Sequence, residues 1–187
     1  MPISPLDANT ALVIIDLQRG IASYPTVHPL DDVVRHAGEL AAAFRRHHLP
    51  VVLVNATGGA PGRTQKPSNA APRTPDWLEF MAALDRQPHD HVITKRTWGA
   101  FTHTDLEAHL KRLGVTQVVL AGVATSIGVE STARHAHELG FHVALAVDAM
   151  TDIGLDAHNH SVTRIFPRLG ENATTHEILE LLKKRLE

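Results

Sequence analysis

The sequence contains no cysteine, and this absence removes several kinds of chemistry. The protein has no disulfide bond, no thiolate nucleophile and no thiolate ligand for a metal ion. A chain without cysteine also fits a reducing compartment, so we expect a cytoplasmic protein.

Long apolar runs and an excess of one charge are lacking as well. No apolar stretch approaches the ~20 residues that a membrane-spanning helix needs, and the first residues, MPISPLDANT, lack the basic and apolar regions of a secretion signal. The formal net charge is only −2, which does not predict a basic surface for nucleic acid. We therefore expect a protein that acts on a small molecule and binds neither nucleic acid nor a membrane.

The apolar residues are arranged as short runs between helical patterns. The 187 residues suffice for one α/β domain with a sizeable core, and we expect a single domain over residues 1–187. Runs rich in Val, Ile and Leu that alternate with helices are typical of a parallel sheet covered on both faces. The predicted strands are residues 11–15, 50–55, 91–95, 117–122 and 142–150, with a weak last strand within 171–175.

Helical patterns occupy about residues 31–48, 102–114 and 174–187, and a helix-like segment follows the strand at 117–122. Thr174 and Thr175 are plausible N-caps of the last helix. Residues 56–75 differ from the rest because they are crowded with Gly and Pro. At that length we interpret them as a functional loop or lid.

Chemically useful groups follow three of the predicted strands. Asp16 follows the first, Lys95 ends the third, and a loop of small residues, 122–126, follows the fourth. Ligands of open α/β sheets bind beyond the carboxyl ends of the strands, so an acid, a cation and backbone N–H groups can meet there. From spacing alone the alternative stays open that Asp16 is a turn residue, Lys95 is solvated and the loop is a tight turn.

Three strings carry a resemblance to a known family: ALVIIDLQRG, KRTWGAFTHTDLEAHL and AGVATSIGVESTARHAHELG. Their order and spacing resemble the isochorismatase-like hydrolase superfamily, the cysteine hydrolases that include nicotinamidases and N-carbamoylsarcosine amidases. The resemblance implies a Rossmann-like three-layer αβα fold with a six-stranded, mostly parallel sheet, and family members are usually homo-oligomers. Within this superfamily, the motifs resemble those of uncharacterised stand-alone members that contain the string IGVESTAR, as residues 127–134 do here.

The resemblance also implies site residues. Asp16 and Lys95 match the aspartate and lysine of the family's Asp–Lys–Cys triad, whereas Gly128 stands where the cysteine would be. It further implies a cis peptide bond between Val123 and Ala124, with the N–H groups of Ala124 and Gly128 facing a substrate oxygen. Thioester chemistry is excluded because glycine has no side chain.

Isochorismatase itself is similar in having an Ile-Gly pair at this point. It hydrolyses a vinyl ether to pyruvate and a dihydroxybenzoate precursor without a covalent intermediate. The resemblance therefore implies that Asp16 protonates the substrate and water attacks. Two alternatives stay open: Asp-activated water could attack an amide or imine, or the chain could bind a small molecule without turnover.

We expect no cofactor and no metal. Asn55 stands where nicotinamidases carry an Asp-x-His metal element, and the 14 histidines form no metal-binding motif. We interpret them, including His135, His137 and His158, as surface or hydrogen-bonded residues. The chain also ends without an aryl-carrier domain, so we do not expect a bifunctional siderophore enzyme.

Further residues are candidates for substrate binding. Trp98 and Phe101 can pack on a ring or an alkyl group, although ordinary core or interface packing is an equal alternative. The complete set of substrate-binding candidates is Gln18, Trp98, Phe101, Ala124 and Thr125, and those for a substrate carboxylate are Arg63, Lys66, Arg73 and Arg96. Arg134, on the helix after the loop, is expected to face solvent or another subunit.

Overall fold

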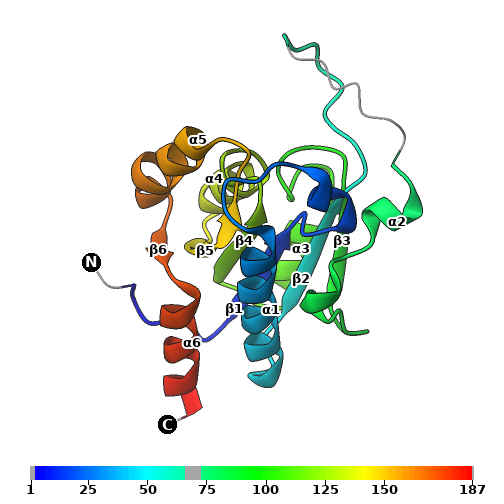
Figure 1. Ribbon diagram of the computed structural model, residues 1–187. Coiled ribbons are helices and arrows are strands. Elements are labelled where there is room, and N and C mark those ends of the chain that lie inside the picture. The colour runs from blue at the N-terminus through cyan, green and yellow to red at the C-terminus, as the bar shows by residue number, and fades with distance from the viewer. Residues whose placement is uncertain (1–2, 66–72, 187) are drawn as a thin grey trace.

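The computed structural model describes residues 3–65 and 73–186, which form a six-stranded parallel sheet with helices on both faces (Figure 1). All ladders between neighbouring strands are parallel. The predicted α/β class is confirmed. The strands are β1 (Thr10–Ile15), β2 (Val51–Ala56), β3 (His91–Lys95), β4 (Gln117–Val123), β5 (His142–Thr151) and β6 (Glu171–Ala173).

The helices are α1 (Leu30–Arg46), α2 (Pro75–Leu78), α3 (Leu106–Arg112), α4 (Glu130–Glu138), α5 (Leu155–His160) and α6 (Thr175–Lys183). Four of them, α1, α3, α4 and α6, lie close to the ranges that the sequence predicts, whereas α2 and α5 were not predicted. The short 3₁₀ or π turns are η1 (Arg19–Ser23), η2 (Ala82–Leu84), η3 (Thr125–Val129), η4 (Ser161–Ile165), η5 (Phe166–Arg168) and η6 (Lys184–Leu186). Thr174 caps α6 in a capping box with Glu177. None of the helices in the described ranges is both long and apolar enough to cross a bilayer.

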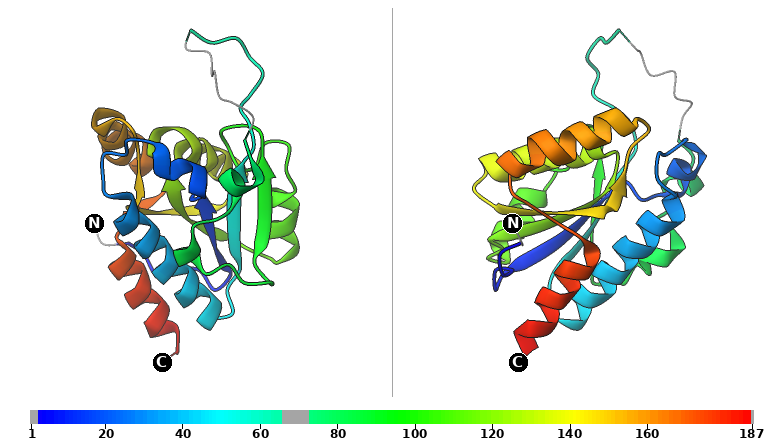
Figure 2. Two further views of the ribbon diagram at one scale, coloured as in Figure 1. Left: turned by 45° about the vertical axis from the view of Figure 1, so that its right-hand side comes forward. Right: turned by 60° about the vertical axis from the view of Figure 1, so that its left-hand side comes forward.

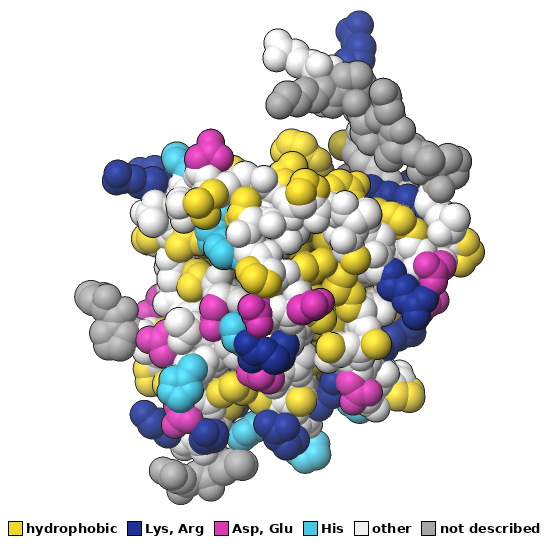
Figure 3. All heavy atoms as spheres, in the orientation of Figure 1, with side chains coloured by type: hydrophobic (Ala, Val, Ile, Leu, Met, Phe, Trp, Pro, Cys, Tyr) yellow, Lys and Arg dark blue, Asp and Glu magenta, His cyan; other side chains and the backbone are white. Residues whose placement is uncertain are grey.

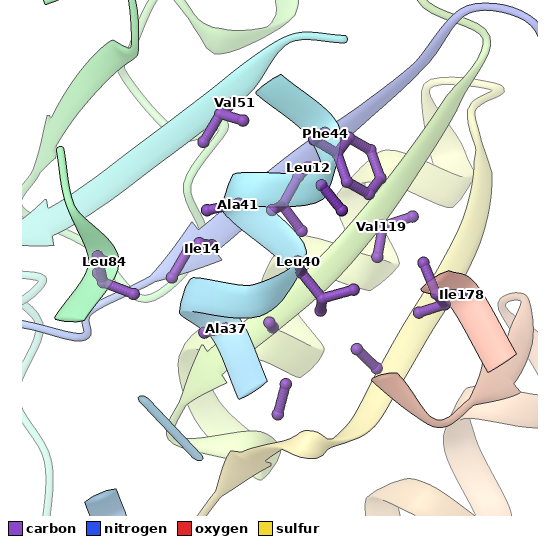
Figure 4. Close-up of a cluster of buried hydrophobic side chains, with 14 of the residues drawn as sticks. Leu12, Ile14, Ala37, Leu40, Ala41, Phe44, Val51, Leu84, Val119 and Ile178 are labelled. Carbon is purple, nitrogen blue, oxygen red and sulfur yellow. The ribbon is translucent and has the colours of Figure 1, made fainter. Parts of the chain in front are cut away.

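Successive side chains along each strand point to opposite faces of the sheet, so the molecule has two hydrophobic cores, one on each face. In β1, Leu12 and Ile14 belong to the cluster under α1 and α6, whereas Val13 and Ile15 belong to the cluster on the opposite face with α3 and α4. Figure 4 shows the first cluster, in which side chains of α1 such as Leu40 lie over the strands. All six residues of β1 are buried, which explains the continuous apolar run.

Figure 2 shows α1 (blue) and α6 (red) side by side on one face of the sheet. On the surface drawn in Figure 3, basic and acidic side chains are interspersed, mostly over the lower half of the view. The helices of this face therefore turn their apolar sides to the sheet and their charged sides to solvent.

The strand order, β3-β2-β1-β4-β5-β6, reverses direction between β1 and β4. Ligands of open α/β sheets bind at such a reversal, beyond the carboxyl ends of the strands. At this point Gly122 pairs with Ile15, and a β-carbon on Gly122 would lie 2.0 Å from the Ile15 carbonyl oxygen. Gly122 also has a φ of +122°, so only glycine fits where these two strands meet.

Candidate functional site

Asp16 lies at the reversal of the sheet, directly after β1. Its φ of +54° is in the left-handed region, which aspartate tolerates better than most residues. Its N–H donates to the carbonyl oxygen of Val54, in β2, over 2.8 Å. The chain therefore leaves the sheet at Asp16, beside both neighbouring strands.

Lys95 reaches Asp16 from the far side of β2. It ends β3, two strands from β1 or about 9.6 Å at normal strand spacing. Its buried side chain crosses this gap, and Nζ donates to Asp16 Oδ2 over 2.7 Å and to the Thr97 carbonyl oxygen over 3.2 Å. The structure thus brings together the acid and the cation that the sequence placed at two strand ends.

The environment of Asp16 makes its carboxyl a weaker acid than an exposed aspartic acid. Burial raises the pKa of the Asp16 carboxyl, although the charges of Lys95 and Arg73 and the hydrogen bond from Lys95 act in the opposite direction. The second carboxylate oxygen, Oδ1, is buried and has no hydrogen-bond partner among the described residues. A raised pKa and an unpartnered oxygen suit a group that exchanges protons with a substrate or water.

The loop after β4 forms the other side of the site. The Val123–Ala124 peptide bond is cis, as the resemblance implies. The turn η3 follows, and the N–H groups of Ile127 and Val129 both donate to the Ala124 carbonyl oxygen over 3.1 Å. The Gly128 carbonyl oxygen accepts from Thr132 Oγ1 over 2.7 Å, which orders the backbone of the loop.

Gly128 lies against Asp16. A β-carbon at this position would lie 3.5 Å from Asp16 Oδ2, 3.1 Å from Ile15 Cγ2 and 3.2 Å from the Val123 carbonyl oxygen. The position therefore faces the carboxylate, but this chain offers only a hydrogen atom there.

The family model described as Isochorismatase domain matches residues 10–177, which include the whole sheet and the site. The chain belongs to the isochorismatase family. It is therefore a cysteine-free member of a family of hydrolases, with glycine at the position that faces Asp16.

Two relatives and one solved structure cover nearly the whole chain. The uncharacterised isochorismatase family protein YecD of Escherichia coli O157:H7 is 43% identical over 93% of this chain and 96% of its own length. The uncharacterised isochorismatase family protein YwoC of Bacillus subtilis (strain 168) is 41% identical over 94% of this chain and 95% of its own length. An isochorismatase family protein from Burkholderia thailandensis has a TM-score of 0.93 and 42% identity, covering 97% of this chain and 99% of that one.

Of the predicted substrate-binding residues, Gln18 is engaged with the protein backbone. It is fully buried; its Oε1 accepts from the Ala56 N–H over 2.8 Å and its Nε2 donates to the carbonyl oxygens of Ala56 and Trp77. In this isochorismatase family member Gln18 therefore joins the ends of β1, β2 and α2, and a contact of Gln18 with a substrate stays a prediction.

Two further candidates also lie in the protein interior. Phe101 is buried in the core and packs against His135 and Phe141, with ring centroids 5.4 and 6.0 Å away. Thr125 is fully buried, and its Oγ1 lies 2.8 Å from His158 Nδ1. Trp98, by contrast, is 60% exposed, so among the two aromatic candidates only Trp98 has a surface for another molecule.

Arg73 is the basic candidate that the structure places nearest the site. It donates to the Ala56 carbonyl oxygen over 2.5 Å and its guanidinium lies 4.1 Å from the ring centroid of Trp77. Its charge also acts on the pKa of Asp16. Arg63 and Arg96 are exposed, and Lys66 lies outside the described residues.

Within residues 3–65 and 73–186, no three His, Asp or Glu side chains are arranged to hold a metal ion.

Sequence reasoning assigned no site role to two polar groups behind the loop, although it did interpret His158 as a surface or hydrogen-bonded residue. Asp152 and His158, from the end of β5 and from α5, both bind the loop after β4. The rule that found Asp16, a polar residue directly after an apolar strand, also points to Asp152 when applied to β5.

Proposed function

We propose that this protein hydrolyses a small carboxylate-bearing molecule, with Asp16 as the acid–base group and water as the attacking molecule. The observation that carries the proposal is the state of Asp16: Oδ2 binds Lys95, whereas Oδ1 is buried and unpartnered among the described residues. A buried oxygen without a partner is costly unless a ligand or water supplies one. Gly128 leaves the space beside the carboxylate without a nucleophile.

Vinyl-ether hydrolysis is the reaction that best suits this arrangement. Asp16 donates its proton to the terminal carbon of the vinyl group, and water adds to the oxygen-bearing carbon of the resulting oxocarbenium ion. The added water then loses a proton, which restores Asp16, and the hemiketal breaks into a ketone and an alcohol. Each atom is accounted for without a covalent intermediate on the protein.

The neighbours of Asp16 have separate roles in this scheme. The ammonium of Lys95 stabilises the carboxylate that remains after proton donation. The N–H groups of Ala124 and Gly128 bind a substrate oxygen, as helix-start donors do for anions. This role of the two N–H groups is supported by the rigidity of the loop. The neighbouring N–H groups of Ser126, Ile127 and Val129 form hydrogen bonds within the protein and fix the loop backbone.

Arg73 supports a substrate with a carboxylate. Arginine has five N–H donors in a planar fork that matches a carboxylate. The contact with the Ala56 carbonyl oxygen and the stacking on Trp77 hold the guanidinium near Asp16. A substrate carboxylate would therefore be bound beside the reacting group.

The test is incubation of the purified protein with isochorismate and measurement of pyruvate. We expect turnover by the wild type and a loss of at least about 100-fold in Asp16→Asn, since a positioned acid or base contributes about that much. Asp85→Asn is the matched control, because Asp85 is also an aspartate with a left-handed φ but is exposed. Equal rates for wild type and Asp16→Asn would contradict the proposal.

The same protein samples separate the alternatives. Release of ammonia from a panel of amides, lost in Asp16→Asn, would keep the role of Asp16 and replace the vinyl ether by an amide. Isochorismate binding without any turnover would indicate a non-catalytic homologue.

A further inference from the structure

The loop after β4 is held from behind by groups that the proposed reaction does not use. Ser126 donates its N–H to Asp152 Oδ2 over 2.7 Å, and Asp152 Oδ1 accepts from the Ile153 N–H over 2.8 Å. Asp152 is almost completely buried. A buried carboxylate bound to backbone N–H groups is a strong anchor, because such hydrogen bonds are charge-assisted.

A pair of imidazoles forms the second anchor. His158 Nδ1 lies 2.8 Å from Thr125 Oγ1, and both side chains are buried. The ring of His28, from the segment before α1, packs edge-on against His158 at 4.6 Å between centroids. His28 Nδ1 in turn lies 3.0 Å from Thr151 Oγ1, beside Asp152. Segments from three parts of the chain thus meet behind η3.

The surroundings favour neutral His158. Burial lowers the pKa of the His158 imidazole, positive charge on His28 lowers it further, and Asp152 opposes both. Among the described residues, the charges that act on His158 are those of His28, from the segment before α1, and Asp152, directly after β5. A neutral imidazole has one acceptor nitrogen, which can accept a hydrogen bond from the Thr125 hydroxyl. Protonated imidazole has only donors, so the bond to Thr125 would have to reverse.

We propose that His158 is a positioning residue: in its neutral form it holds Thr125, and thereby sets the orientation of the loop N–H groups toward Asp16. Protonation of His158 forces the hydrogen bond with Thr125 to reverse and so shifts the loop, while Asp152 still holds Ser126. The catalytic consequence rests on the proposed function, whereas the effect on the loop is measurable without a substrate.

The structural test follows the backbone amide of Ser126 by NMR between about pH 5 and pH 8, the range in which histidine titrates. In the wild type we expect this resonance to shift with the titration of His158. His158→Asn places an amide near the Nδ1 position and cannot titrate, so the shift should disappear. His160→Asn is the matched control, because His160 is exposed on the same helix, and it should leave the shift unchanged.

Variants of Thr125 test the hydrogen bond between its hydroxyl and His158. Thr125→Val removes the hydroxyl at constant shape and should raise hydrogen exchange of the Ser126 and Ile127 amides about tenfold at neutral pH, whereas Thr125→Ser should not. His158→Leu should resemble Thr125→Val, and the double variant should add little because one bond is lost in each. If His158→Leu lowers stability but leaves loop exchange and its pH dependence unchanged, His158 only fills space and the inference is wrong.

Turnover provides the second readout. With isochorismate we expect His158→Leu to lower kcat by up to about 100-fold, as small misplacements of a site do, with KM changed less. The acid limb of the pH–rate profile that belongs to His158 should be missing in His158→Asn. A wild type that titrates as described but forms no pyruvate would refute the proposed function alone, whereas normal turnover with an unresponsive loop would refute this inference alone.

Discussion

Gly128 faces Asp16 so closely that a β-carbon added to the glycine would lie 3.5 Å from Asp16 Oδ2. Such an atom would lie 3.1 Å from Ile15 Cγ2 and 3.2 Å from the Val123 carbonyl oxygen, so these neighbours must shift by a few tenths of an ångström to admit it. A side chain at position 128 would therefore point at the Asp16 carboxylate, and this has a direct test.

We expect Gly128→Cys to fold and to place a thiol beside Asp16 and Lys95. The nearby cation and base should promote the thiolate, so the variant should gain amide hydrolysis and form an acyl-enzyme detectable by intact mass. The control is Gly59→Cys, because no atom lies within 4 Å of a β-carbon there. Absence of both signals in a folded Gly128→Cys protein would show that more than one side chain separates this site from the amidases.

The Asp16–Lys95 pair should be strongly coupled in stability. Asp16→Asn leaves the buried Lys95 ammonium without its counter-ion, and the loss of one partner of a buried pair costs about 3–5 kcal/mol. Asp16→Asn combined with Lys95→Met should cost much less than the sum of the single changes. Free energies of unfolding from urea titrations of the four proteins measure this difference, and additive losses would contradict it.

Lys95→Met should also change how stability depends on pH. Burial already raises the pKa of Asp16 in the folded protein, and loss of the Lys95 charge raises it further. The folded state then binds a proton at pH values where the unfolded state does not. Relative to the wild type, the variant should therefore gain stability as the pH falls from the folded-state pKa toward the unfolded value near 3.8. A pH-independent difference in unfolding free energy would exclude this account.

Gly20→Ala should displace Trp77. A β-carbon on Gly20 would lie 1.9–2.1 Å from atoms of the indole ring, so the ring must move away. Because Arg73 stacks on that ring, we expect weaker binding of a carboxylate substrate, seen as a raised KM with kcat changed less. Gly59→Ala, in open space, is the control. Unchanged Trp fluorescence and KM in Gly20→Ala would contradict the predicted displacement.

The stacked pair of His91 and His109 should make the protein less stable in mild acid. Their ring centroids are 3.7 Å apart, and burial, followed by the charges of His91 and Arg112, lowers the pKa of His109. As the pH falls below the unfolded value of 6.5, the unfolded state binds a proton that the folded state resists, so stability declines. His109→Gln should make this decline shallower, whereas exposed His176→Gln should not. Thermal unfolding between about pH 5 and pH 8 measures both slopes.

The sheet was predictable from the sequence because its central strands β1, β2 and β4 are buried on both faces. Such strands must be largely apolar along their whole length, so these three stand out as runs rich in Val, Ile and Leu. Asp16 and Lys95 were predictable for the related reason that a polar residue directly after such a run lies at the ligand-binding edge. Family motifs then assigned roles to both residues and to Gly128.

Contacts between side chains distant in sequence were not predictable in this way. Gln18, Phe101 and Thr125 have side chains that could bind a substrate, but tertiary packing directs Gln18 to the backbone of β2, Phe101 into the core and Thr125 toward His158. The sequence by itself determined the parallel α/β sheet and the positions of Asp16 and Lys95 at strand ends, since periodicity and strand ends are local properties. Only the tertiary structure decided which polar groups reach the site and which hold it from behind, because that depends on how β5 and α5 fold back onto the loop after β4.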